Sequence, residues 1–180
     1  MSEAYEPHVA EVTGQGMLTL RADLSAPEIT AAIQSATGLA VPQPRQITSD
    51  ADRSLAWMSS DEAMLFCPRA EIASLLVALS DALGEAFATC VDVSDARRVY
   101  EISGPGAREC IAKLTPAPMA PERFGPGEMR RTRLAQVATA LWMPAPDQVR
   151  LMCFRSVAQY VEDLLAVSAK PGGALRVFAD

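Results

Sequence analysis

The chain has 180 residues, of which 49% are hydrophobic, and its 16 lysines and arginines face 22 aspartates and glutamates, a net charge of −6. This length suffices for one domain or for two small halves that share a core, and the acidic balance argues against a nucleic-acid partner, which calls for a basic surface. No run of about 18 apolar residues occurs, so the sequence predicts no membrane-spanning segment.

Residues 1–16 look like a polar tail that ends in the turn Gly14-Gln15-Gly16. A strand pattern at 17–23 follows these glycines, whereas a phosphate-binding fingerprint needs a helix there. The N-terminus is acidic and has no apolar segment, so we expect no signal peptide and a cytoplasmic location.

The first half of the chain predicts a β-α-β-β-α-β series. Ser25 and Glu28 are spaced as a capping box for a helix that Gly38 ends. The whole series is a strand at 17–23, this helix, a loop at 39–53, a hairpin of 54–58 and 63–67, a helix at 69–83 and a strand at 87–93.

Two segments of this half are the most informative. The stripe of the 69–83 helix follows helical spacing closely. The 54–67 hairpin does not alternate cleanly between apolar and polar residues, so we expect both faces of its sheet to be covered. The stripe residues are Ile72, Leu75, Leu76, Leu79 and Leu83.

The second half repeats the pattern. It predicts a strand at 99–103, a helix at 106–114, a proline-bearing loop at 115–128, a hairpin of 133–143 and 149–154, a helix capped by Ser156, and a last strand at 175–178.

We therefore predict an α+β fold of two tandem ferredoxin-like β-α-β-β-α-β halves, about 17–96 and 97–180, joined in a single compact domain over 17–180. Their antiparallel sheets carry helices on one face. Apolar residues on both faces require that the two sheets cover each other or that a partner covers them.

Cysteine and histidine usage points to no metal site. Cys67, Cys90, Cys110 and Cys153 form no CxxC pair, and the single histidine, His8, lies in the predicted tail. We expect four reduced, mostly buried thiols.

Two polar motifs are candidates for a catalytic or binding site. The corner Ser103–Ala107 joins a strand to a helix, but Pro105 offers no N–H to an anion, so a tight turn is the better interpretation. Asp92, Ser94 and Asp95 have the composition of an ordinary polar turn, and a triad with His8 would need hydrogen-bond contact. The sequence thus predicts no catalytic, cofactor-binding or metal residues.

The arginines at 97–98 and at 130, 131 and 133 have two interpretations. In the first, they bind a carboxylate-rich ligand or acidic side chains of a partner. In the second, they lie at solvated strand ends. We expect Trp57 and Trp142 to lie in the core and not to form a stacking platform for a ligand.

Five segments, taken in order, carry a resemblance to a known family. They are GMLTLRADL at 16–24, LAWMSSDEAMLFCP at 55–68, VDVSDARRVYEISGPGARECIAKL at 91–114, RFGPGEMRRTRLAQVATALW at 123–142 and VRLMCFRSVAQYVEDLL at 149–165. As an ordered set they resemble the gamma subunit family of heterotetrameric sarcosine oxidase. The family is related to the aminomethyltransferase fold of the glycine-cleavage system.

The resemblance implies a small non-catalytic subunit of an enzyme that oxidatively demethylates sarcosine. It places FAD, FMN, NAD, tetrahydrofolate and zinc on other subunits, with the folate and flavin sites on the larger ones and zinc on the smallest. The implied partners are the alpha, beta and delta subunits, mainly the large alpha subunit.

Two alternatives remain open at this point: a free-standing folate-binding or one-carbon-transfer protein of the aminomethyltransferase fold, and a generic interaction domain. Under the subunit interpretation, segments 55–67 and 123–142 contribute to the contact with a larger subunit, because they combine two-sided apolarity with neighbouring arginines. The predicted interface residues are Trp57, Phe66, Arg130, Arg131 and Trp142.

Overall fold

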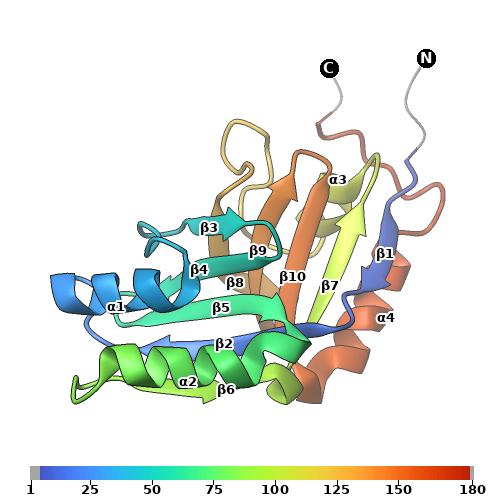
Figure 1. The fold of residues 1–180 in the computed structure, drawn as a ribbon. Coiled ribbons are helices and arrows are strands. Elements are labelled where there is room, and N and C mark those ends of the chain that lie inside the picture. The colour runs from blue at the N-terminus through green and yellow to red at the C-terminus, as the bar shows by residue number, and fades with distance from the viewer. Residues whose placement is uncertain (1–4, 179–180) are drawn as a thin grey trace. The chain divides into compact units, whose positions relative to one another are not determined.

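The computed structural model describes residues 5–178, which form two compact units (Figure 1). The first unit comprises residues 14–95. The second unit combines residues 5–13 with residues 96–178. Each unit contains one five-stranded sheet in which all neighbouring strands are antiparallel, so the predicted α+β class is confirmed.

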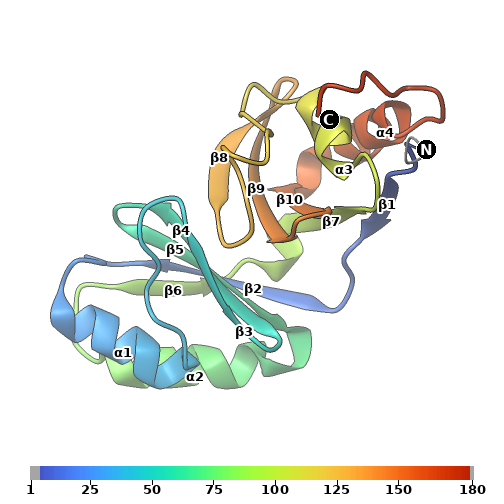
Figure 2. The ribbon, with the colours of Figure 1, turned by 90° about the horizontal axis from the view of Figure 1, so that it is seen from above.

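The sheet of the first unit has the strand order β3-β4-β5-β2-β6, and its two α-helices cover one face (Figure 2). The core lies between the helices and this face. Its helical side comes from Ile29 and Ile33 of the first helix and from the predicted apolar stripe of residues 72–83 in the second. The elements are β2 (Gln15–Arg21), α1 (Pro27–Thr37), β3 (Ile47–Asp50), β4 (Arg53–Ser59), β5 (Glu62–Pro68), α2 (Ile72–Leu83) and β6 (Thr89–Asp92).

Strand β5 shows why the hairpin sequence does not alternate. Leu65 lies in the core with the helices, and its neighbours Met64 and Phe66 point to the other face, yet all three are at most 1% exposed. A strand that is buried on both faces reads as a continuous apolar run. The predicted hairpin of β4 and β5 is confirmed.

The second unit repeats the arrangement with the strand order β1-β7-β10-β9-β8. Its core lies between one sheet face and the helices α3 and α4. The elements are β1 (His8–Glu11), β7 (Arg97–Ser103), α3 (Ala107–Ala112), β8 (Met129–Leu134), β9 (Val137–Ala145), β10 (Gln148–Phe154) and α4 (Ala158–Ser168).

The edge strand next to β7 comes from the N-terminus, which corrects two predictions. Residues 8–11 were expected in a polar tail but pair with β7 as β1, and Val9 packs against the core. Segment 175–178 was expected to be the last strand and is not one. Its backbone instead turns to α3, where the amides of Leu175 and Arg176 donate hydrogen bonds to the carboxylate of Glu109.

Two further strands lie where the sequence predicted otherwise. β3 lies inside the predicted loop 39–53, and the predicted strand 133–143 is the end of β8, a tight turn and β9. Ala135 makes this turn with a φ of 50°. Both missed strands are short edge strands with many polar residues, so they lack the apolar run that marks a buried strand.

The predicted helix caps are wrong at Ser25 and Ser156. The Ser25 hydroxyl donates to Asp23 at 2.6 Å, and α1 begins after Ala26 without a side-chain cap. Ser156 lies inside a short 3₁₀ turn, Arg155–Val157, that precedes α4. The predicted C-cap is confirmed, because Gly38 ends α1 with a left-handed φ of 79°.

Candidate functional site

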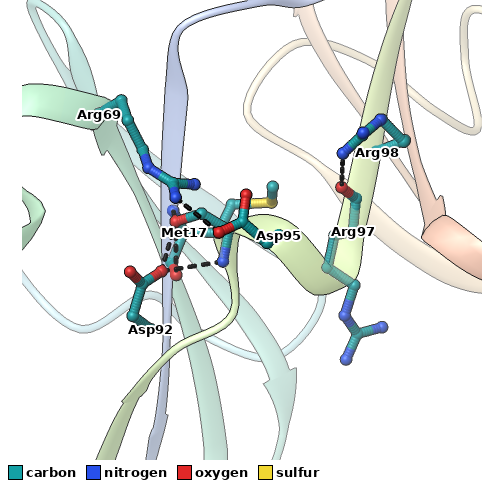
Figure 3. A network of polar contacts seen from close by, with 7 residues as sticks. Met17, Arg69, Asp92, Asp95, Arg97 and Arg98 are labelled. Carbon is teal, nitrogen blue, oxygen red and sulfur yellow. Dashed lines mark hydrogen bonds and ion pairs between the residues drawn. The ribbon is translucent and has the colours of Figure 1, made fainter.

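The polar turn after β6 is a structural element of the first unit (Figure 3). The Ser94 hydroxyl donates to Asp92 Oδ1 at 2.5 Å and accepts a hydrogen bond from the Met17 amide at 2.9 Å. Arg69 Nη2 donates to Asp95 Oδ2 at 2.7 Å. These side chains hold the start of β2 and the end of β6 together. His8, the partner a triad would need, lies on β1 of the other unit.

The Ser103–Ala107 corner is a tight turn in the second unit. Gly104 and Gly106 both have left-handed φ values, 86° and 88°. The Ala107 amide donates to the Gly104 carbonyl at 3.0 Å, so it is engaged within the turn. A Cβ on Gly106 would lie 2.4 Å from the Tyr5 ring. Glycine at 106 therefore allows the N-terminal segment to approach closely. The helix that follows, α3, has only six residues.

Three of the arginines weighed as binding residues, at 97, 98 and 130, have partners within their own unit. Arg98 forms an ion pair with Glu11 at 3.0 Å, and the Arg97 guanidinium stacks on the Phe154 ring at 3.9 Å from its centroid. Arg130 forms an ion pair with Glu128 at 2.8 Å. These contacts join neighbouring strands and loops.

The thiols are poor nucleophiles in this fold. Cys67, Cys110 and Cys153 are buried and Cys90 is half-buried, and all four are free cysteines. Burial raises the pKa of Cys67, Cys90 and Cys153 from the ordinary value of 9.0 to about 11. Because the thiolate is the reactive form, these groups stay protonated and unreactive at neutral pH.

Residues 5–178 contain no group of three or more histidine, cysteine, aspartate or glutamate side chains placed to hold a metal ion. Over the same residues, none of the helices combines the length and the apolar character that crossing a bilayer requires.

The second unit contains a polar cluster that the sequence does not predict. Lys113 Nζ donates to the Tyr5 hydroxyl and the Ser168 carbonyl, each at 2.6 Å, and to the Gly173 carbonyl at 3.0 Å. Together with Glu109, it ties residues from both ends of the chain to α3. Tyr5 and Lys113 are far apart in sequence and carry no motif, so no local pattern signals their contact.

The five predicted interface residues lie in different environments. Phe66 and Trp142 are 1% and 3% exposed, so both side chains are buried. Trp57 and Arg130 are half-buried, and Arg131 is exposed. Trp57 and Phe66 belong to the first unit and the other three to the second. Their role in an interface stays a prediction.

A solved structure of low sequence identity shares the fold of this chain. The aminomethyltransferase T of the glycine cleavage system from Bartonella henselae shares it with a TM-score of 0.65 at 10% identity, over 89% of this chain and 45% of that one. At this identity the likeness concerns the fold alone. The protein is thus a two-unit α+β protein with this fold.

The particular family follows from the sequence. The chain belongs to the sarcosine oxidase gamma subunit family, whose pattern matches residues 21–169. It is 35% identical over 115 residues to the sarcosine oxidase subunit gamma of Corynebacterium sp. strain P-1, a match that covers 62% of this chain and only 55% of that relative.

A solved structure is similar over almost the full length. A chain of the heterotetrameric sarcosine oxidase from Corynebacterium sp. U-96, solved in complex with pyrrole 2-carboxylate, superposes with a TM-score of 0.88 at 26% identity. The match covers 98% of this chain and 90% of that one.

Proposed function

We propose that this chain is the non-catalytic structural gamma subunit of a heterotetrameric flavoenzyme that oxidatively demethylates sarcosine to glycine. The observation that carries the proposal is the similarity to a chain of the Corynebacterium heterotetramer, which spans 98% of this chain and 90% of that one. Because almost all of both chains is matched, the similarity supports the same position for this chain in a similar assembly.

The proposal assigns the reaction to other chains. FAD, FMN, NAD and tetrahydrofolate belong to the larger alpha and beta subunits and zinc to the delta subunit, and this chain packs mainly against alpha in the cytoplasm. The geometry is in keeping with a structural role: the hydroxyl of Ser94 and the carboxylate of Asp92 bond each other and the start of β2, and burial keeps the thiols protonated.

Purification of the tagged chain from its own cells tests the proposal. We expect a yellow eluate with a flavin absorption spectrum, in which mass spectrometry identifies three further subunits. A colourless protein that elutes alone would contradict the proposal. In that event titration with tetrahydrofolate would test the alternative, a free-standing folate-binding protein, to which the aminomethyltransferase-like fold lends support.

A further inference from the structure

Strand β6 forms an open edge of the sheet in the first unit. It is the last strand in the order β3-β4-β5-β2-β6 and pairs with β2 (Figure 1). The Val93 amide donates to the Met17 carbonyl at 2.9 Å. Because the hydrogen bonds of antiparallel strands alternate, the N–H and C=O groups of Cys90 and Asp92 point away from β2, toward the open edge.

Large apolar side chains accompany this edge. Phe87, two residues before β6, is 103% exposed, and Val91, within β6, is 44% exposed. Val91 points to the face opposite Cys90, which packs against the core. The corresponding edge strand of the second unit, β1, carries no large exposed hydrophobic residue among His8–Glu11. An exposed apolar edge strand is a template for pairing with another chain, which natural sheets generally protect.

The segment that contains β6 carries charge of one sign, and Arg21 of β2, which lies opposite Thr89, is paired with Asp61 and Glu62. Residues 70–96 contain five acidic residues and no lysine, arginine or histidine. Glu71 and Asp95 form ion pairs with Arg53 and Arg69, respectively. The exposed carboxylates of Asp81, Glu85 and Asp92 remain around the edge. A segment that docks here gains favourable electrostatics if it carries lysine or arginine.

We propose that the β6 edge binds an extended, basic segment of a larger partner subunit, which joins the sheet as an additional strand. The outward backbone groups of Cys90 and Asp92 supply the main-chain hydrogen bonds, and Phe87 and Val91 contact alternate apolar side chains of the segment. Lysine or arginine residues of the segment face Glu85 and Asp92. This inference rests on the proposed subunit function and names the surface and the chemistry of one contact.

The substitution Val91→Lys tests the edge. It places a positive charge where a basic strand would dock, and its side chain is exposed, so the fold should tolerate it. We expect the amount of larger subunits that co-purifies with the tagged variant to fall at least about tenfold relative to the wild type. The melting temperature of the variant should be unchanged. Val167→Lys is the matched control, because Val167 is also an exposed valine, 62% exposed, on α4 of the other unit. The control should retain the subunits as the wild type does.

Hydrogen exchange distinguishes strand addition from a contact of side chains alone. The amides of Cys90 and Asp92 should exchange fast in the isolated chain and at least about tenfold more slowly in the complex. Two results would overturn the edge proposal and leave the subunit function standing, provided that the wild-type chain retains its subunits. In the first, Val91→Lys retains the subunits equally well. In the second, the amides of Cys90 and Asp92 are not protected in the complex.

Two other outcomes also count against the edge proposal. If the isolated chain forms a dimer that Val91→Lys dissociates while subunit retention is unchanged, the edge binds a second copy of this chain. If the wild type retains no subunit at all, the subunit function fails, and the edge proposal fails with it.

Discussion

Gly16 shows how a single position in β2 is fixed by a neighbouring element. Its backbone has no left-handed φ, so conformational freedom is not the reason for a glycine here. A Cβ at this position would lie 2.4 Å from Ile72 Cγ1 and 3.3 Å from the Arg69 Cα. The absent side chain lets the start of α2 approach the strand.

Gly16→Ala should therefore lower the free energy of unfolding by about 1–3 kcal/mol through overpacking. Ile72→Ala removes the clashing atoms, so the double variant should be more stable than the sum of the two single effects predicts. Urea denaturation of the four proteins measures this coupling. Strict additivity would show that Ile72 moves aside without cost.

The raised pKa values of the cysteine thiols imply that the folded protein loses stability at alkaline pH. The pKa of Cys67, Cys90 and Cys153 is about 11 in the folded chain against an ordinary 9.0. The unfolded chain loses these protons from about pH 9 and the folded chain only near pH 11, so the stabilisation is complete below pH 9 and declines between these values.

We expect the melting temperature to be nearly constant from about pH 7 to pH 8.5 and to fall as the pH approaches 11. Cys67→Ala should make this decline shallower, because one of these thiols no longer titrates. A melting temperature that is flat up to pH 11 would contradict the burial of these thiols.

At the scale of elements, β1 is the least expected part of the fold. It is short and largely exposed, yet it completes the sheet of a unit whose other strands begin at residue 97. The Val12 amide donates to the Val99 carbonyl at 2.8 Å. By the antiparallel alternation, the Ala10 amide faces β7, and the Glu11 amide faces away.

Ala10→Pro removes a donor from the ladder and should destabilise the second unit by about 1–3 kcal/mol, although the Ala10 side chain is exposed. Glu11→Pro is the control, because its amide points outward and its ion pair with Arg98 lies at the surface. Hydrogen exchange should accelerate in β7 for Ala10→Pro and change little for Glu11→Pro. Equal effects would argue that β1 is not held by this ladder.

The elements also show what the sequence could predict. The apolar stripe of α2 and the buried run of β5 were found because a periodic pattern within one segment marks them. β1, β3 and β8 were missed because short polar edge strands are defined by their partners far along the chain. The final strand was misplaced for the same reason: residues 8–11 and 175–178 are both short segments, and only tertiary packing decides which one pairs with β7.

The candidate site was predictable to a smaller extent. The Asp92–Ser94 turn and the Ser103–Ala107 corner were read correctly as turns, because their residue types have strong local preferences. The Lys113–Tyr5 cluster could not be found, since it joins residues from opposite ends of the sequence. The interface residues came from two-sided apolarity, which identifies buried strands but not what covers them.

At the scale of the whole molecule, the two tryptophans separate folding from assembly. Trp142 is 3% exposed, and Trp142→Ala should cost about 3–5 kcal/mol of stability. Trp57 is only half-buried, so Trp57→Ala should cost about 0.5–3 kcal/mol and reduce the retention of partner subunits. Melting temperature and subunit retention are measured separately on each variant. Trp57→Ala with full retention would remove Trp57 from the predicted interface.

The central claim is that this chain is one structural subunit of a larger flavoenzyme. Native mass spectrometry of the complex purified through this chain tests it most directly. The account predicts an assembly of four different polypeptides that contains one copy of this chain and loses no flavin when this chain is released. A lone chain, an assembly of identical copies, or flavin that stays with this chain after dissociation would contradict the account.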